Sequence, residues 1–133
     1  MTLHIIRGLP GSGKSTYAKT LGCLHAEADM YHFQDGKYTY IPEKKVLAHR
    51  WCQKTVWAAM KNGMDVCVSN TFTRRGEVQP YLDMAKETGH TVKITKMTGE
   101  YPSIHNVPEE IMQKMKDRWV DIEGEETLQL DDL

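Results

Sequence analysis

The chain has 133 residues, of which 40% are hydrophobic and 26% charged, and its formal net charge at pH 7 is −1. These values are typical of one globular domain with its own core, and they exclude disordered and fibrous chains. No apolar run approaches the roughly 18 residues of a membrane span, and the first residues do not resemble a secretory signal. The sequence therefore predicts neither membrane insertion nor secretion.

The three cysteines, Cys23, Cys52 and Cys67, are odd in number and far apart in the sequence. This pattern indicates reduced thiols that fill the core, and not a disulfide framework or a set of metal ligands. Because free thiols persist in a reducing compartment, we expect a cytoplasmic protein.

The C-terminal end of the chain is acidic. From Asp121 onward there are six acidic residues and no Lys or Arg, whereas residues 1–120 hold 17 basic and 12 acidic residues. We therefore expect a domain over residues 1–120, with a charge of +5, and an acidic C-terminal tail over residues 121–133. The tail is predicted to be either a solvated, frayed terminus or a polyanionic segment that covers the basic body and competes with nucleic acid.

The first part of the chain alternates between short apolar segments and a helical one. Residues 3–6 predict a strand, residues 14–21 predict a helix, and residues 24–28 predict a second strand that ends at Asp29. Residues 33–41 contain an Asp-Gly turn and alternating tyrosines, which together predict a small hairpin.

A long helix is predicted over residues 42–63, because Pro42 suits a first helical position and Gly63 suits the end of a helix. The 3.6-residue period predicts that its buried stripe consists of Leu47, Trp51, Thr55, Ala58 and Ala59.

The rest of the chain predicts two more strands and two more helices. Residues 65–69 form a β-branched run typical of a strand covered on both faces, and residues 91–97 predict a fourth strand. Residues 77–89 predict a helix with Pro80 in its first turn, and residues 108–120 predict the last helix.

This β-α-β-α-β-α-β-α order predicts an α/β fold of three layers, α/β/α, with a mainly parallel sheet of about four strands. Ligands of such sheets bind at the carboxyl ends of the strands. Three loops are expected at that edge: the glycine-rich loop, the segment around Asp29, and residues 69–76.

The glycine-rich stretch "RGLPGSGKST", residues 7–16, contains the pattern G-x-x-x-x-G-K-[ST] between a strand and a helix. Glycines let backbone N–H groups approach a polyphosphate, the lysine neutralises the β- and γ-oxygens, and the following hydroxyl ligates Mg²⁺. The motif predicts that ATP is bound, with Ser15 as a ligand of Mg²⁺. The predicted binding residues are Gly8, Pro10, Gly11, Ser12, Gly13, Lys14, Ser15 and Thr16.

Asp29 ends the second predicted strand, fifteen residues after Lys14. A carboxylate at this place could accept a proton from a hydroxyl that attacks the γ-phosphate. The alternative is an Asp that caps the following loop.

Several motifs together resemble the small P-loop kinases of the polynucleotide 5′-kinase type, which include the kinase domain of the bacteriophage enzyme. The resemblance is closer still to the kinase-like domain of animal ubiquitin-ligase-binding proteins, and it covers about residues 3–119. Its motifs are "RGLPGSGKST", "EADMYHF", "DGKYTYIPEKKVLAHRWCQ", "VSNTFTRRGEVQPYLDMA" and "HNVPEEIMQKM".

The resemblance implies a P-loop kinase-like domain over residues 1–120 that transfers the γ-phosphate of ATP, with Mg²⁺, to a hydroxyl. In this family the acceptor is typically the 5′-hydroxyl of a nucleic acid. By resemblance, Lys14 and Ser15 match the phosphate and metal residues, and Asp29 matches the general base.

The chain departs from the family pattern at three places. His32 stands where the bacteriophage-type pattern has an arginine, and Ser69 and Asn70 stand where an acid usually ends the third strand. In the lid, residues 102–108 read "PSIHNVP", so the family's lid arginine is missing.

Arg74 and Arg75, at the start of the third helix, are the candidates to replace that arginine, or to hold phosphates of the acceptor. We assign His32, Asn70 and Arg75 to the substrate side, and His105 is a further candidate for contact with the nucleotide. A group of aromatic and basic residues is expected beside the acceptor. It would suit the binding of a single-stranded nucleic acid, or its side chains only pack within the hairpin. This group consists of His32, Phe33, Lys37, Tyr38, Tyr40, Lys44 and Lys45.

Three functions are compatible with these residues. The first is a polynucleotide 5′-hydroxyl kinase in which Asp29 is the base and Arg74 or Arg75 assists. The second is a small-molecule kinase, for example of a nucleoside, since residues 24–60 contain only Arg50 to hold an acceptor phosphate. The third is a catalytically weakened nucleotide-binding module, favoured by the missing lid arginine and third-strand acid.

Overall fold

The computed structural model describes residues 1–34, 36–39, 41–101 and 107–132. Its centre is a five-stranded sheet of order β2-β5-β1-β6-β7, in which every paired neighbour runs parallel. The strands are β1 (Thr2–Gly8), β2 (Leu24–Ala26), β5 (Val66–Asn70), β6 (Thr91–Met97) and β7 (Glu126–Leu128). The predicted α/β class is thus confirmed, with five strands and not four.

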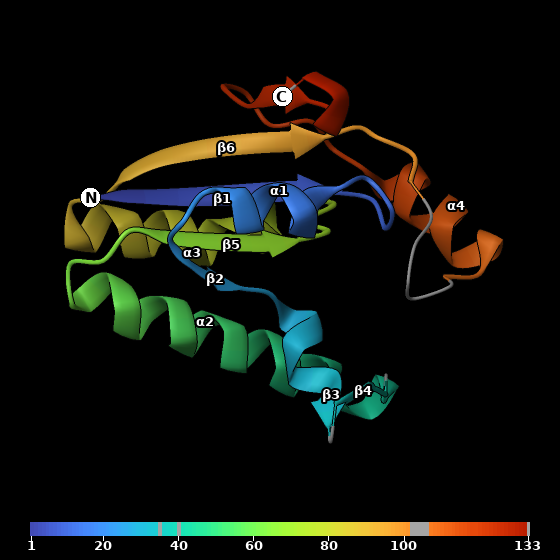
Figure 1. Cartoon of the computed structure of the whole chain (residues 1–133), viewed down its shortest axis with the longest axis horizontal. Coiled ribbons are helices and arrows are strands. Elements are labelled where there is room, and N and C mark those ends of the chain that lie inside the picture. Colours follow the sequence, from blue (N-terminus) through green and yellow to red (C-terminus); the bar gives the residue numbers. More distant parts are fainter. Residues whose placement is uncertain (35, 40, 102–106, 133) are drawn as a thin grey trace.

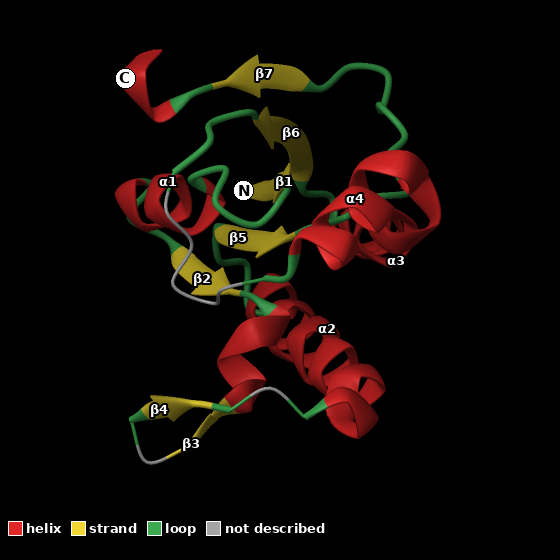
Figure 2. Cartoon of the chain, turned by 90° about the vertical axis from the view of Figure 1, so that its right-hand side faces the viewer, coloured by secondary structure: helices red, strands yellow, loops and turns green. Residues whose placement is uncertain are grey.

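Helices lie on both faces of the sheet, which makes three layers (Figures 1 and 2). One face carries α1 (Lys14–Thr20), and the opposite face carries α2 (Lys45–Lys61) and α3 (Arg75–Thr88). Helix α4 (Glu109–Arg118) lies beyond the carboxyl ends of the strands, at the right of Figure 1. The described part of the chain contains no helix that is long and apolar enough to cross a membrane.

Short elements complete the chain. The predicted hairpin is present as β3 (Phe33–Gln34) and β4 (Lys37–Tyr38), which pair antiparallel. Three short 3₁₀ segments are also present: one before the hairpin, one before α2 and one after β7. They are η1 (Ala28–His32), η2 (Pro42–Lys44) and η3 (Leu130–Asp132).

The core divides into two clusters because side chains alternate between the faces of each strand. Leu3 and Ile5 of β1 pack toward α2 and α3, whereas Ile6 packs toward α1 with Cys67. The three cysteines are free thiols, as predicted, and Cys52 and Cys67 are buried.

The predicted stripe of α2 is displaced by one position along the helix: of its five residues Ala59 is buried as predicted, and the other four are not. The residues that are buried are Ala48, Cys52, Val56, Ala59 and Met60. Leu47 is instead 46% exposed, and Trp51 and Thr55 are only partly buried. The 3.6-residue period is correct. The face of α2 that packs against η1 and the sheet carries the small side chains of Ala48 and Cys52, and the larger Leu47 and Trp51 lie to the side of it.

Helix α3 begins earlier than predicted. Glu77 accepts a hydrogen bond from the backbone N–H of Arg74 at 3.3 Å, which caps the helix two residues before the predicted start. Pro80 is therefore the sixth helical residue and lies in the second turn, so the prediction of a first-turn position is wrong.

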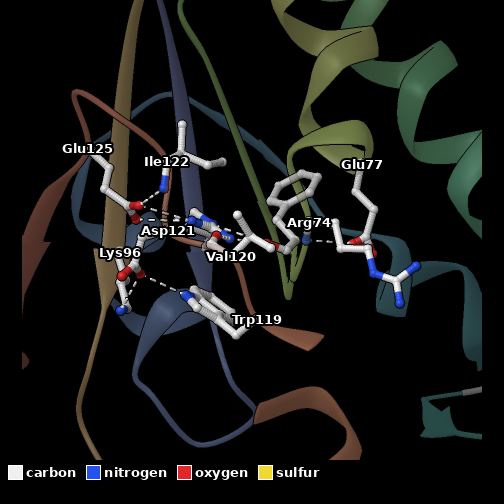
Figure 3. Close-up of polar contacts among 10 residues, drawn as sticks. Arg74, Glu77, Lys96, Trp119, Val120, Asp121, Ile122 and Glu125 are labelled. Carbon is white, nitrogen blue, oxygen red and sulfur yellow. Dashed lines mark hydrogen bonds and ion pairs between the residues drawn. The ribbon is translucent and has the colours of Figure 1, made fainter. Parts of the chain in front are cut away.

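The acidic C-terminal segment is part of the sheet. Glu126–Leu128 forms β7, whose residues pair with Thr95–Met97 of β6, so the expectation of a frayed terminus is wrong. Figure 3 shows how the preceding residues are held: Asp121 accepts hydrogen bonds from Lys96 Nζ at 2.8 Å and from Trp119 Nε1 at 3.0 Å. The segment thus lies against the basic β6, and a competition with nucleic acid stays a prediction.

Candidate active site

The phosphate loop joins β1 to α1 at the carboxyl edge of the sheet. Gly11 and Gly13 have φ angles of 82° and 93°, in the left-handed region where a side chain would be strained. A Cβ atom at Gly8 would overlap the Ser12 hydroxyl and lie 3.0 Å from the carbonyl oxygen of Met97, so glycine lets the loop pack closely on β1. The glycines thus permit the backbone conformation that a phosphate loop requires.

Polar atoms of this loop remain available to a ligand. Within the described residues, the buried hydroxyl of Ser12 has no hydrogen-bond partner. Burial lowers the pKa of the Lys14 ammonium, while the carboxylates of Glu27 and Asp29 act in the opposite direction. These groups are compatible with an anion and its cation: Lys14 and the loop could bind phosphate, and the Ser15 hydroxyl could be a ligand of Mg²⁺.

Ser15 is hydrogen-bonded to an acidic residue: its hydroxyl donates a hydrogen bond of 2.6 Å to Oε2 of Glu27. Burial raises the pKa of Glu27, but the His25 imidazole, whose Nε2 lies 3.6 Å from Oε2, and hydrogen bonds from Ser15 and Ser69 outweigh burial and bring that pKa from 4.5 to about 2. Glu27 is therefore an ionised carboxylate beside the phosphate loop. Glu27 is not among the residues predicted from the sequence, although two acids at the end of the second strand, in "EAD", are a usable signal.

Asp29 lies in η1, which a side chain of the neighbouring strand holds in place. Asn70, the last residue of β5, accepts a hydrogen bond from the backbone N–H of Ala28 at 2.8 Å through Oδ1. Its amide nitrogen lies 3.7 Å from the thiol sulfur of Cys52. Asn70, assigned to the substrate side from the sequence, thus also positions the segment that carries Asp29.

A cavity of about 570 Å³ extends from the phosphate loop between η1, α2, α3 and α4. It brings together five of the thirteen predicted site residues at the edge where the three loops meet. Its walls include Pro10, Lys14, Asp29, His32, Asn70 and Arg118. The volume is in the usual range of small-molecule sites.

The arginine in this cavity is not one of the two predicted. Arg74 and Arg75 are exposed at the start of α3 and are not among the described residues that line the cavity. Arg118, the last residue of α4, lines it, and its Nε donates a hydrogen bond of 3.1 Å to Oγ1 of Thr73. A basic residue in the last turn of the final helix is ordinary, so no pattern in the sequence distinguishes Arg118.

Of the remaining predicted residues, some are buried, some are exposed and some are not described by the structure. His32 is buried, at 4% exposure, and Thr16 is exposed on α1. Phe33 is 47% exposed on the hairpin. Tyr40 and residues 102–106, which include His105 and most of the predicted lid motif, lie outside the described residues.

Most of the chain is similar to a known protein family. Residues 3–98 match the family described as an AAA domain, AAA_33. The chain belongs to this family. It is 29% identical over 100 residues to NEDD4-binding protein 2 of Homo sapiens, of which it covers 6%. It is 28% identical over 132 residues to the uncharacterized protein PM0531 of Pasteurella multocida; that match spans 86% of this chain and 74% of PM0531.

Solved structures similar to this AAA_33 chain have a P-loop kinase-like fold. A sugar kinase from Janibacter sp. superposes with a TM-score of 0.66 at 17% identity, over 96% of this chain and 83% of the other. A chain of the Pnkp1/Rnl/Hen1 complex superposes with a TM-score of 0.60 at 22% identity, over 85% of this chain and 38% of the other. Kti12 of Chaetomium thermophilum in complex with ADP-AlF3 superposes with a TM-score of 0.62 at 14% identity, over 98% of this chain and 90% of the other. At these identities the likeness establishes the fold.

Proposed function

We propose that the protein is an ATP- and Mg²⁺-dependent phosphotransferase whose acceptor is the 5′-hydroxyl of a nucleic acid. One observation carries the proposal: Lys14 of the phosphate loop and Asp29 of η1 line the same cavity. A nucleotide phosphate on the loop and a hydroxyl beside Asp29 would meet inside it.

The residues of the cavity suggest how transfer proceeds. Asp29 accepts the proton of the acceptor hydroxyl while that oxygen forms a bond to the γ-phosphorus. The bond from this phosphorus to the bridging oxygen of the β-phosphate breaks, and ADP leaves. Lys14 neutralises charge on the phosphate oxygens, and Ser15 would hold Mg²⁺, which supplies further neutralisation.

Arg118 is the guanidinium that we place beside the transferred phosphate, in place of Arg74 and Arg75. Its Nε donates to Thr73, and no described residue is hydrogen-bonded to the terminal nitrogens of the guanidinium, which can therefore bind an anion. An arginine of this kind contributes about 10³-fold or more to the rate of transfer. We expect Arg118→Ala to lower kcat by about that factor. Arg74→Ala and Arg75→Ala are the matched comparison, and a comparable loss in either would restore the first assignment.

The hairpin supports a nucleic acid as the acceptor. It projects from the body of the protein on the side of α2 (Figure 2). It carries the exposed ring of Phe33 together with the exposed Lys37, and the exposed Lys45 lies both at the start of α2 and in the wall of the cavity. An aromatic ring among cations suits a single strand whose 5′ end enters the cavity.

A small-molecule acceptor is the second candidate, because α4 closes one side of the cavity with apolar side chains. Ile111 and Met115 line it there, and their contact with an acceptor would favour a compact one. The sugar kinase with a similar fold supports this alternative.

The test is transfer of label from γ-labelled ATP to a 5′-hydroxyl oligonucleotide, in DNA and RNA forms. We expect transfer by the wild type, and none to the same oligonucleotide bearing a 5′-phosphate. Lys14→Ala and Asp29→Asn should abolish transfer, whereas Lys19→Ala and Asp83→Asn, which change exposed residues of α1 and α3, should not. Transfer to sugars or nucleosides alone would establish the small-molecule kinase. Tight ATP binding without transfer to any acceptor would leave a binding module.

A further inference from the structure

The strand next to the phosphate loop lacks a carboxylate. β5 lies beside β1 and ends with Ser69 and Asn70, where an acid would complete a magnesium site together with the hydroxyl of the loop. In many P-loop proteins the loop hydroxyl and an acid on that strand share this task. The described structure offers a carboxylate from a different strand.

Glu27 follows β2, which pairs with the far side of β5. The last pair of that ladder is Ala26 with Val68, so Glu27 comes level with Ser69. Ser69 donates a hydrogen bond of 2.8 Å to Oε2 of Glu27, the same oxygen that Ser15 reaches at 2.6 Å. The side chain of Glu27 thus extends past β5 to the phosphate loop.

The hydrogen bonds fix the direction in which the Ser15 hydroxyl points. Ser15 has one proton, and it donates this proton to Glu27, so the lone pairs of its oxygen remain for a cation. Ser69 has also given its proton to Glu27, and it accepts from Nε2 of His25, 2.6 Å away. His25 and Ser69 therefore hold Glu27, and Glu27 holds Ser15.

We propose that Glu27 is the carboxylate of the magnesium site, supplied by β2 in place of the acid missing from β5. It is a positioning residue: it orients Ser15 toward Mg²⁺ and adds a negative charge beside the cation. This inference rests on the proposed binding of ATP with Mg²⁺.

The number of protein ligands fits a cation that arrives with a nucleotide. Within the described ranges, no three His, Cys, Asp or Glu side chains form a cluster that could hold a metal ion. The hydrogen bonds to Glu27 from described residues end on Oε2, which leaves Oε1 for a water of the hydration shell of the cation. Mg²⁺ commonly keeps several waters and takes one or two protein oxygens beside the phosphates of the nucleotide.

The experiment compares the affinity for ATP with and without Mg²⁺ by titration calorimetry. We expect Mg²⁺ to tighten binding to the wild type, and Glu27→Gln to remove about 10- to 100-fold of that gain while affinity in EDTA stays the same or rises. A residue that only supported the fold would weaken binding equally in both conditions. Enhancement of water proton relaxation by bound Mn²⁺ gives a second readout that needs no catalysis.

Two further variants sharpen the test. Glu87→Gln changes an exposed acid of α3 and should keep the full magnesium gain. The double variant Glu27→Ser with Ser69→Asp returns the carboxylate to β5 and should restore the gain. An equal gain in wild type and Glu27→Gln would overturn the assignment of Glu27. A wild type that binds no ATP under either condition would overturn the proposed function itself.

Discussion

Arg7 and Glu125 are 118 residues apart in the sequence and form an ion pair of 3.0 Å between Nη1 and Oε2, with side chains 0% and 7% exposed. Arg7 also donates to the carbonyl oxygen of Phe72 through Nε, at 3.0 Å, and to that of Val120 at 2.7 Å. Its guanidinium carbon lies 4.1 Å from the centre of the Trp119 ring. The arginine just before the phosphate loop thus anchors the segment that leads to β7.

Removal of either partner should destabilise the fold strongly. Glu125→Gln leaves the charge of Arg7 buried without its counter-ion. Arg7→Met removes the donor to the carbonyl groups of Phe72 and Val120 and the cation beside Glu125, whose carboxylate then keeps, among the described residues, only the backbone N–H of Ile122. We expect each variant to lower the free energy of unfolding by about 3–5 kcal/mol, measured by urea denaturation. The double variant should lose less than the sum.

The control for this pair is an ion pair of the same segment at the surface. Glu126 lies 3.7 Å from Nζ of Lys93, and its side chain is 67% exposed. Glu126→Gln should change the free energy of unfolding by less than about 1 kcal/mol. If Glu125→Gln cost no more than Glu126→Gln, the role of Arg7 as an anchor would be wrong.

The face of α2 that packs on the core is tested by one buried and one exposed residue. Val56 is fully buried in the larger core cluster, whereas Leu47, of the predicted stripe, is 46% exposed. Val56→Ala should cost about 2–3 kcal/mol in unfolding free energy, from lost burial and the cavity left behind. Leu47→Ala should cost about 0.5 kcal/mol or less. Thermal or urea denaturation of the two variants measures both losses. A larger loss for Leu47→Ala than for Val56→Ala would instead support the stripe predicted from the sequence.

Much of the fold could be predicted because its signals are local. The phosphate loop has fixed spacing, β6 is a seven-residue alternating run that was predicted to the residue, and the turn at Asp35-Gly36 marks the hairpin. β7 could not be predicted this way. It has three residues within an acidic run, and it forms because β6 offers a free edge and Arg7 anchors the approach.

The candidate site was predicted where one motif supplies the residues, and missed where two elements meet. Lys14 and Ser15 follow from the phosphate loop alone. Glu27 is recognisable only when the register of β2 on β5 is known, since that register brings it to Ser69 and Ser15. Arg118 enters the cavity because α4 folds back over it, which no local pattern specifies.

Asn70 should matter for the placement of Asp29. Asn70→Ala removes the acceptor of the Ala28 N–H, a buried group, and should cost about 1–3 kcal/mol in unfolding free energy. If the proposed function holds, the rate of transfer should fall as well, because η1 loses its attachment. Asn70→Asp keeps an acceptor oxygen at the same place, so it should retain more stability than Asn70→Ala. Equal losses would show that the Ala28 hydrogen bond is not what Asn70 contributes.

The stability of the protein should fall in mild acid, in part because of His4 on β1. Burial lowers the pKa of His4 below its ordinary 6.5, the charge of Lys93 lowers it further, and Asp65 partly opposes this. The unfolded chain then binds the proton more tightly than the folded one, so stability is full above about pH 6.5 and declines as the pH falls through the folded pKa. His4→Gln removes this group. The unfolding free energy of the variant, followed by urea denaturation from pH 7.5 to 5, should therefore decline less than that of the wild type, and parallel curves would exclude His4 as a source of the decline.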